Sequence, residues 1–93
     1  MGQYSMREAL DRMLVESHWK DRYLAVKLKE DWEALMGKTV ARYTTDVQIR
    51  DHVLYIRTDV AALKNELRYN RELLIEKLNQ HLGEPFIRDI AIM

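Results

Sequence analysis

The chain has 93 residues, the size of one small domain with a single modest core. Hydrophobic residues make up 47% and charged residues 32%, with only three glycines and one proline, so the composition favours a folded, helix-rich domain over a disordered one. Fifteen basic and fifteen acidic residues cancel, which excludes a strong overall attraction to nucleic acid or to an anionic membrane.

The chain contains no cysteine, which excludes disulfides, zinc–thiolate sites and cysteine nucleophiles. No apolar run approaches the roughly 18 residues of a membrane span, and the N-terminal residues lack the apolar stretch of a signal peptide. We therefore expect a cytoplasmic protein that forms one domain over residues 1–93, with residues 1–4 frayed.

Two helices, or one helix with a sharp kink, are predicted in the first part of the chain. Ser5 and Glu8 have the Ser-x-x-Glu spacing of a capping box, which indicates a helix start. A second periodic run predicts another helix, which ends at Gly37 because glycine accepts the positive φ that follows a helix. The buried faces of these helices are expected to contain Met6, Ala9, Leu10, Met13 and Leu14, and then Leu24, Leu28, Trp32 and Leu35.

After Gly37 the hydrophobic period changes from that of a helix to that of a strand. Residues 38–49 alternate and are rich in β-branched and aromatic side chains, which predicts a long first strand. Asp51 and His52 lie at a predicted turn, and residues 53–58 would pair with the first strand as a hairpin. Residues 86–93 are the predicted last strand.

The clearest amphipathic pattern lies between the second and third strands. Its apolar residues follow at spacings of three, four, seven, four and four: Val60, Leu63, Leu67, Leu74, Leu78 and Leu82. We predict a single helix of about 24 residues, capped by Asp59 and stopped by Gly83 and Pro85. The order α-α-β-β-α-β predicts an α+β fold, a small three-stranded sheet packed on this long third helix.

The sequence Gly37-Lys38-Thr39 matches the end of a phosphate-binding loop, and it would indicate a nucleotide enzyme. That loop needs a glycine where Trp32 stands, a strand before it and a helix after it, so we reject this function. The three histidines, His18, His52 and His81, fall in different predicted elements, and their spacing predicts no metal site. We expect no cofactor and no catalytic residue.

Two sets of residues are candidate binding sites. Lys64, Arg68 and Arg71 share one row of the predicted third helix, where they could contact phosphates while Tyr69 stacks on a base. The alternative is that these long basic side chains only cover the edge of the core. Tyr43 and Tyr55 are predicted on adjacent strands, either as an exposed pair that meets a partner or as core residues.

Three blocks of the sequence, in this order, resemble the DciA family of bacterial proteins. They are Trp32 to Gly37, the hairpin from Val47 to Thr58, and Ala62 to Leu67 followed by Leu74 to Gly83. The family carries a Trp and a Gly at the spacing of the first block, a hairpin in the second and a Leu-Ile-x-x-Leu-Asn-x-x-Leu-Gly pattern in the third. The resemblance extends from about residue 6 to the end.

This resemblance implies a KH-like domain of a protein in DNA replication initiation, which associates with the replicative helicase and has some affinity for DNA. The chain departs from the pattern, because it contains no Gly-x-x-Gly clamp, has Asp51-His52 where the family favours Asp-Gly, and lacks the extension of longer members. We expect a non-enzymatic adaptor. The alternative left open is a protein–protein interaction or homodimerisation module that does not bind nucleic acid.

Overall fold

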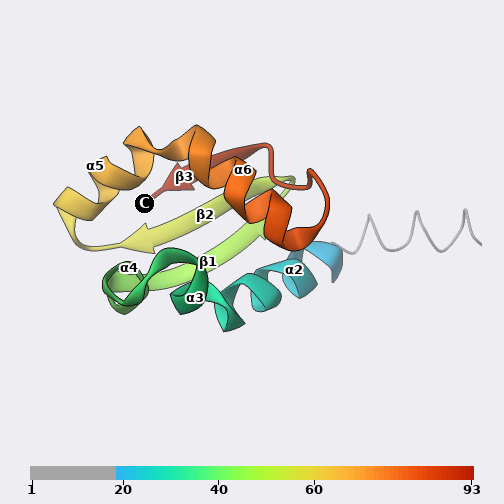
Figure 1. Ribbon diagram of the computed structural model, residues 1–93, viewed down its shortest axis with the longest axis horizontal. Helices are drawn as coiled ribbons and strands as arrows, with labels where there is room; N and C mark the ends of the chain where they lie inside the picture. Colours follow the sequence, from blue (N-terminus) through green and yellow to red (C-terminus); the bar gives the residue numbers. More distant parts are fainter. Residues whose placement is uncertain (1–18) are drawn as a thin grey trace, which may run out of the picture.

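The structure is a computed structural model that describes residues 19–93 (Figure 1). The helix predicted to begin at Ser5, the frayed residues 1–4 and His18 lie outside this range. The predicted α+β class with a small three-stranded sheet is confirmed. The order of elements is α2 (Trp19–Glu30), α3 (Trp32–Met36), α4 (Lys38–Tyr43), β1 (Thr44–Arg50), β2 (Val53–Thr58), α5 (Ala61–Tyr69), α6 (Arg71–Leu82) and β3 (Asp89–Ile92).

The sheet has the strand order β1-β2-β3. β1 and β2 form an antiparallel hairpin, whereas β3 runs parallel to β2. The turn residues Asp51 and His52 have φ values of 50° and 68°, the left-handed region that a two-residue hairpin requires at both positions. The predicted hairpin and its turn are therefore confirmed.

One face of the sheet is buried by helices that approach from both edges. Figure 1 shows α2, α3 and α4 on the side of β1, and α5 and α6 on the side of β3. Leu28, Leu54, Ile56 and Leu78 are fully buried where these layers meet. Each such side chain stabilises the fold by about 1.5–3 kcal/mol, so this face contains the core. The buried strand residues are Val47, Ile49, Leu54, Ile56, Thr58, Ile90 and Ile92.

The prediction of a strand beginning at Lys38 was wrong, because Lys38–Tyr43 is the helix α4. The chain leaves Gly37 into a new helical turn, in which the Ala41 amide donates to the Gly37 carbonyl oxygen over 3.0 Å. Thr44 stabilises the C-terminal end of this helix, because its hydroxyl donates to the Val40 carbonyl oxygen at 2.6 Å. Tertiary packing of half-buried residues in α4 overrides the strand-like alternation.

The prediction of a single long third helix was also wrong, because Asn70 separates α5 from α6. The backbone of Asn70 has φ −96° and ψ 17°, and its side-chain Nδ2 donates to the Glu66 carbonyl oxygen over 3.1 Å. The predicted cap was wrong as well, because Val60 occupies the N-cap of α5 and Asp59 does not. The Val60 amide donates instead to Thr58 Oγ1 at 3.2 Å.

The last strand is shorter than predicted, because the side chain of Asn79 forms hydrogen bonds with the backbone near the predicted start of the strand. Asn79 Oδ1 accepts the Ile87 amide at 2.9 Å, and Asn79 Nδ2 donates to the Ile87 carbonyl oxygen at 2.8 Å. The side-chain amide of Asn79 thus makes the hydrogen bonds that a neighbouring strand would otherwise make. Regular pairing of β3 with β2 starts at Asp89.

Gly37 and Gly83 both have positive φ, as the predicted helix stops require. Gly37 closes α3 with φ 89° and ψ 160°, a region that only glycine adopts readily. Gly83 closes α6 in the left-handed region, with φ 79° and ψ 11°. Both helix ends are confirmed. None of the helices within residues 19–93 combines the length and the apolar character that a membrane crossing requires.

Candidate nucleic-acid interface

A groove of about 700 Å³ lies where the break between α5 and α6 faces β3. Three of the predicted nucleic-acid residues, Arg68, Tyr69 and Arg71, line it together. Its other lining residues are Asn70, Glu72, Leu73, Ile90, Ala91 and Ile92. The helices α5 and α6 run in different directions on either side of Asn70 (Figure 1), and residues of both helices line the groove together with β3.

The two arginines of the groove are tied to the edge strand. Arg68 donates from Nη2 to the Ile92 carbonyl oxygen over 3.3 Å, and Arg71 Nη1 lies 3.1 Å from Asp89 Oδ1. Both ends of the Arg71–Asp89 pair are about half exposed, so water screens the pair and its net contribution to stability is below about 1 kcal/mol. A phosphate could therefore replace Asp89 as the partner of Arg71 at little cost.

Tyr69 and Leu73 are exposed side chains that line the groove. Tyr69 is 90% exposed and Leu73 is 65% exposed, so neither contributes much to the core. They are four residues apart, and the break at Asn70 separates them. An exposed aromatic ring between two arginines is an arrangement that can stack on a base while the cations contact the adjoining phosphates.

Lys64 does not line this groove, although the sequence placed it in the same row. It is half buried one turn earlier on α5. The acidic residues Glu72 and Asp89 offset the charge of the two arginines within the groove. Any binding of an anion here is therefore weak and sensitive to salt.

The predicted pair Tyr43 and Tyr55 does not lie on adjacent strands. Tyr43 is the last residue of α4, it is 45% exposed, and the Arg42 guanidinium lies 5.8 Å from the centre of its ring. Tyr55 is half buried on β2, where it pairs with Gln48 of β1 on the face away from the helices. The two rings therefore belong to different surfaces, because the chain turns into α4 before reaching the sheet.

One of our reasons for rejecting a phosphate loop at Gly37 was wrong. A helix does follow this glycine, whereas we expected a strand. The element before it is still the helix α3, and Trp32 is buried where the loop would need a glycine. The Trp32 Nε1 donates to Thr44 Oγ1 over 3.1 Å, so this stretch is part of the core and not a loop around a phosphate.

The described histidines have structural partners. His52 Nδ1 lies 2.8 Å from the Phe86 carbonyl oxygen, and His81 Nε2 lies 2.9 Å from Asp31 Oδ2, which joins α6 to the residue between α2 and α3. Both histidines are half buried. Across residues 19–93 there is no group of three or more side chains that could hold a metal ion.

Sequence reasoning missed two features that form the groove. The first is the helix break, for which Asn70 was the available signal, since asparagine is a common helix-ending residue with a side chain that competes for backbone hydrogen bonds. The second is the involvement of Asp89 and Ile92, which the sequence could not supply, because the contact joins residues 18 and 24 positions apart.

The structure is a small α+β domain with a groove beside the edge strand β3, and comparison with known proteins supplies its family. The model of the family described as "Dna[CI] antecedent, DciA" matches residues 5–92. The chain belongs to the DciA family. The resemblance seen in the three sequence blocks is thereby confirmed.

Two curated relatives cover nearly all of this chain. A UPF0232 protein of Corynebacterium glutamicum (strain R) is 23% identical over 91 residues, which are 98% of this chain and 51% of the relative. A UPF0232 protein of Streptomyces coelicolor is 24% identical over 91 residues, which are 96% of this chain and 48% of the relative. The chain thus spans about half the length of these relatives. No solved structure matches it.

Proposed function

We propose that this chain is a non-enzymatic adaptor domain in the initiation of bacterial DNA replication, a cytoplasmic role in which it associates with the replicative helicase. The observation that carries this proposal is the match to the DciA family over residues 5–92, because the description of that family refers to the Dna[CI] proteins. A domain with a single small core and an exposed apolar and basic groove suits binding to another macromolecule more than it suits enclosing a substrate.

The same proposal includes weak binding of nucleic acid in the groove between α5, α6 and β3. Arg68 and Arg71 supply the cations, and Tyr69 supplies an exposed ring for stacking. Because Glu72 and Asp89 balance these cations, we expect the affinity to be useful only at low ionic strength or when a partner holds the chain close to DNA.

The experiment for the adaptor function is a pull-down of purified replicative helicase by the tagged chain. A nuclease step removes DNA that could bridge the two proteins, and an unrelated tagged domain of similar size is the control. We expect the helicase to remain on the tagged chain after nuclease treatment. Recovery no higher than with the control domain would refute the association with the helicase.

A parallel sample with Arg68→Ala and Arg71→Ala separates the two parts of the proposal. If the helicase contacts the chain outside this groove, its recovery should survive these substitutions, because they remove only the cations proposed for DNA. Loss of the helicase only in the variant would show that the two proteins meet through this groove.

A further inference from the structure

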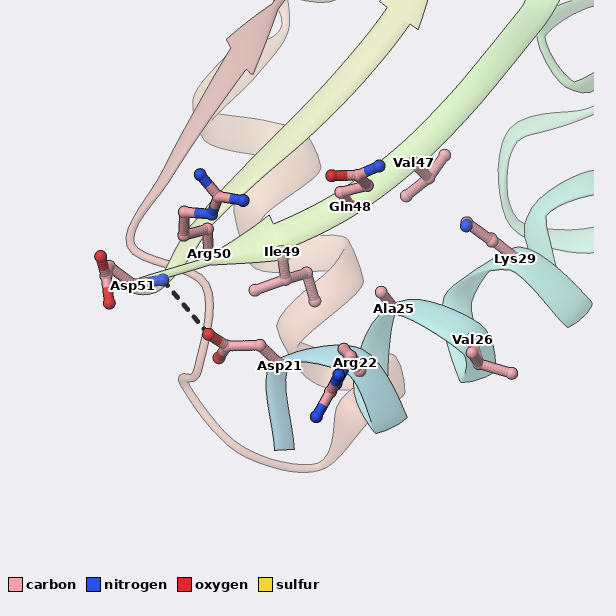
Figure 2. Close-up of a pocket in the computed structure, with 10 residues that line it drawn as sticks. All are labelled: Asp21, Arg22, Ala25, Val26, Lys29, Val47, Gln48, Ile49, Arg50 and Asp51. Atoms are coloured by element: carbon pink, nitrogen blue, oxygen red, sulfur yellow. Dashed lines mark hydrogen bonds between the residues drawn. The ribbon is translucent and has the colours of Figure 1, made fainter. Parts of the chain in front are cut away.

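The sheet has an outer face, opposite the core, which no helix within residues 19–93 covers (Figure 1). Side chains of a strand alternate between its two faces. Figure 2 shows this alternation on β1: Gln48 and Arg50 project on the side away from α2, whereas Ile49 points toward the groove of about 630 Å³ between α2 and β1. The strand register places Tyr55 of β2 beside Gln48 on this outer face, with Ala91 of β3 on its other side.

A hollow of about 300 Å³ lies around Tyr55 on the outer face. The side chain of Tyr55 is half buried, so the sheet supports its ring while part of the ring stays open to solvent. An aromatic ring at the centre of a flat sheet can stack on an unpaired base. The residues that line the hollow are Asp46, Gln48, Arg50, Tyr55, Arg57 and Met93.

The charges on the outer face favour an anionic ligand. Asp46 Oδ1 lies 3.2 Å from Lys29 Nζ of α2, and Asp89 is paired with an arginine of α6, so both carboxylates are offset by cations from other elements. Arg50 and Arg57 are exposed, and neither forms a salt bridge in the part of the chain that the structure describes. These two cations are left in excess, and a polyanion complements them.

The outer face adjoins the groove between α5, α6 and β3. Ala91 lines that groove and also pairs with Tyr55, one strand spacing of about 4.8 Å away. The side chain of Ala91 is a single methyl group, so it forms only a low barrier between the groove and the ring. An extended ligand that leaves the groove could therefore cross β3 and reach Tyr55.

We propose that the outer face of the sheet binds single-stranded DNA. Tyr55 stacks on a base, and Arg50 and Arg57 contact phosphates on either side of it. This inference rests on the nucleic-acid binding proposed above, and it adds a second surface for the same strand, which continues from the groove across β3. Duplex DNA does not suit this face, because its bases are already stacked on one another and a ring within a flat sheet cannot reach between them.

The first test is binding of labelled oligo-dT of about 4 to 16 nucleotides, measured by fluorescence anisotropy at low ionic strength. Tyr55→Val removes the ring and keeps a residue that favours strands, and it should weaken binding at least about fivefold. Tyr55→Phe should retain the affinity. Equal affinity of Tyr55→Val and the unchanged chain would overturn the proposal, as would an equal loss for a duplex of the same length.

Substitutions of the two arginines test the phosphate contacts without altering the core, because both side chains are exposed. Arg50→Ala and Arg57→Ala should each weaken binding of oligo-dT and reduce the slope of log K against log salt by about 0.7. The matched control is Arg88→Ala, an exposed arginine that lines neither the hollow nor the groove. Losses no larger than that of the control would contradict binding on the outer face.

The same assay separates the outer face from the groove. Losses both in the sheet variants and in Arg68→Ala would support one strand that contacts the two surfaces. Losses in the sheet variants alone would assign DNA to the outer face and refute the groove, whereas losses in Arg68→Ala alone would refute the outer face. No binding by the unchanged chain would refute both DNA surfaces and leave the association with the helicase standing.

A labelling test locates the strand directly and uses the absence of cysteine in the chain. Gln48→Cys places a thiol beside Tyr55, and Lys38→Cys places one at an exposed position of α4 outside both surfaces. Saturating oligo-dT should slow alkylation of the first thiol by a neutral reagent and leave the second unchanged. Equal rates for Gln48→Cys with and without oligo-dT would show that DNA does not cover this face.

Discussion

The guanidinium of Arg68 on α5 donates a hydrogen bond to the carbonyl oxygen of Ile92 on β3, over 3.3 Å. This oxygen points to the free edge of the sheet, where an uncovered carbonyl could pair with another chain. Arg68 therefore covers β3 and also presents a cation in the groove beside Tyr69. The hydrogen bond to Ile92 gives Arg68 a structural role, and the binding role proposed above would be additional to it.

The two roles of Arg68 can be separated by measuring binding and stability on the same variants. Arg68→Ala should lower the free energy of unfolding by about 0.5–1.5 kcal/mol through loss of one hydrogen bond, as measured by urea unfolding. Arg68→Ala and Arg71→Ala should each weaken binding of labelled single-stranded DNA and reduce the slope of log K against log salt by about 0.7. The control is Arg88→Ala, which removes an exposed arginine outside the groove. If that variant loses as much affinity, the groove is not the DNA site.

Tyr69 offers a test in which stability and binding should respond differently. Because its side chain is 90% exposed, Tyr69→Ala should leave the melting temperature nearly unchanged. Binding of single-stranded DNA should weaken by about 1–3 kcal/mol if the ring stacks on a base, and Tyr69→Phe should retain the affinity. Fluorescence anisotropy at low ionic strength measures both variants. Equal binding by Tyr69→Ala and the unchanged chain would rule out stacking on this ring.

A substitution at Gly37 tests the helix end through the backbone conformation alone. A Cβ atom at this position meets nothing within 4 Å, so the cost of a side chain comes from φ 89° and ψ 160° and not from a clash. We expect Gly37→Val to lose roughly 1–3 kcal/mol in thermal or urea unfolding. The matched control is Gly83→Asn, because asparagine tolerates the left-handed region at φ 79° and ψ 11°. A fully stable Gly37→Val variant would contradict the assigned conformation.

The Asp46 carboxylate should make the free energy of unfolding depend on pH. The hydrogen bond from Lys29, together with those from the Val47 amide and Gln48, holds the pKa of Asp46 below its ordinary value of 3.8. A carboxylate with a lowered pKa stabilises the folded state above the unfolded pKa, and this contribution is lost as the pH falls through the folded pKa. The contribution of this exposed group is below about 1 kcal/mol.

The measurement is the free energy of unfolding of Asp46→Asn and of the unchanged chain between neutral pH and pH values below the ordinary pKa of the carboxyl group. The unchanged chain should be the more stable at neutral pH, and the difference should disappear in acid. High salt should reduce the difference at neutral pH, since the Lys29 partner is exposed. A difference that stays constant with pH would show that the charge of Asp46 does not contribute.

The elements with regular local patterns could be predicted from the sequence. The hairpin around Asp51 and His52 and the stop at Gly83 were predicted and are confirmed. The helix containing Leu24 and Leu28 was also predicted, but it ends at Glu30, and Trp32 begins the separate helix α3. In each of these, the residues that decide the structure are within a few positions of one another, so period and turn chemistry are sufficient.

The errors occurred where distant residues decide between two local structures. Residues 38–43 alternate as a strand would, yet packing against the core makes them a helix after Gly37. A leucine pattern that continues through Asn70 concealed the break between α5 and α6, because the apolar spacing resumes after one residue. Asn79 shortened β3 through contacts that no local pattern signals.

By itself the sequence determined the α+β class, the buried leucines, the glycine stops and the resemblance to a replication family, because each depends on residue type and short-range spacing. Only the tertiary structure decided that Arg68, Tyr69 and Arg71 line one groove, and that Tyr43 and Tyr55 do not form a pair. The same is true of the groove between α2 and β1. A surface is made by the packing of elements far apart in the chain, and the free energy of that packing is shared among many weak contacts that no single segment encodes.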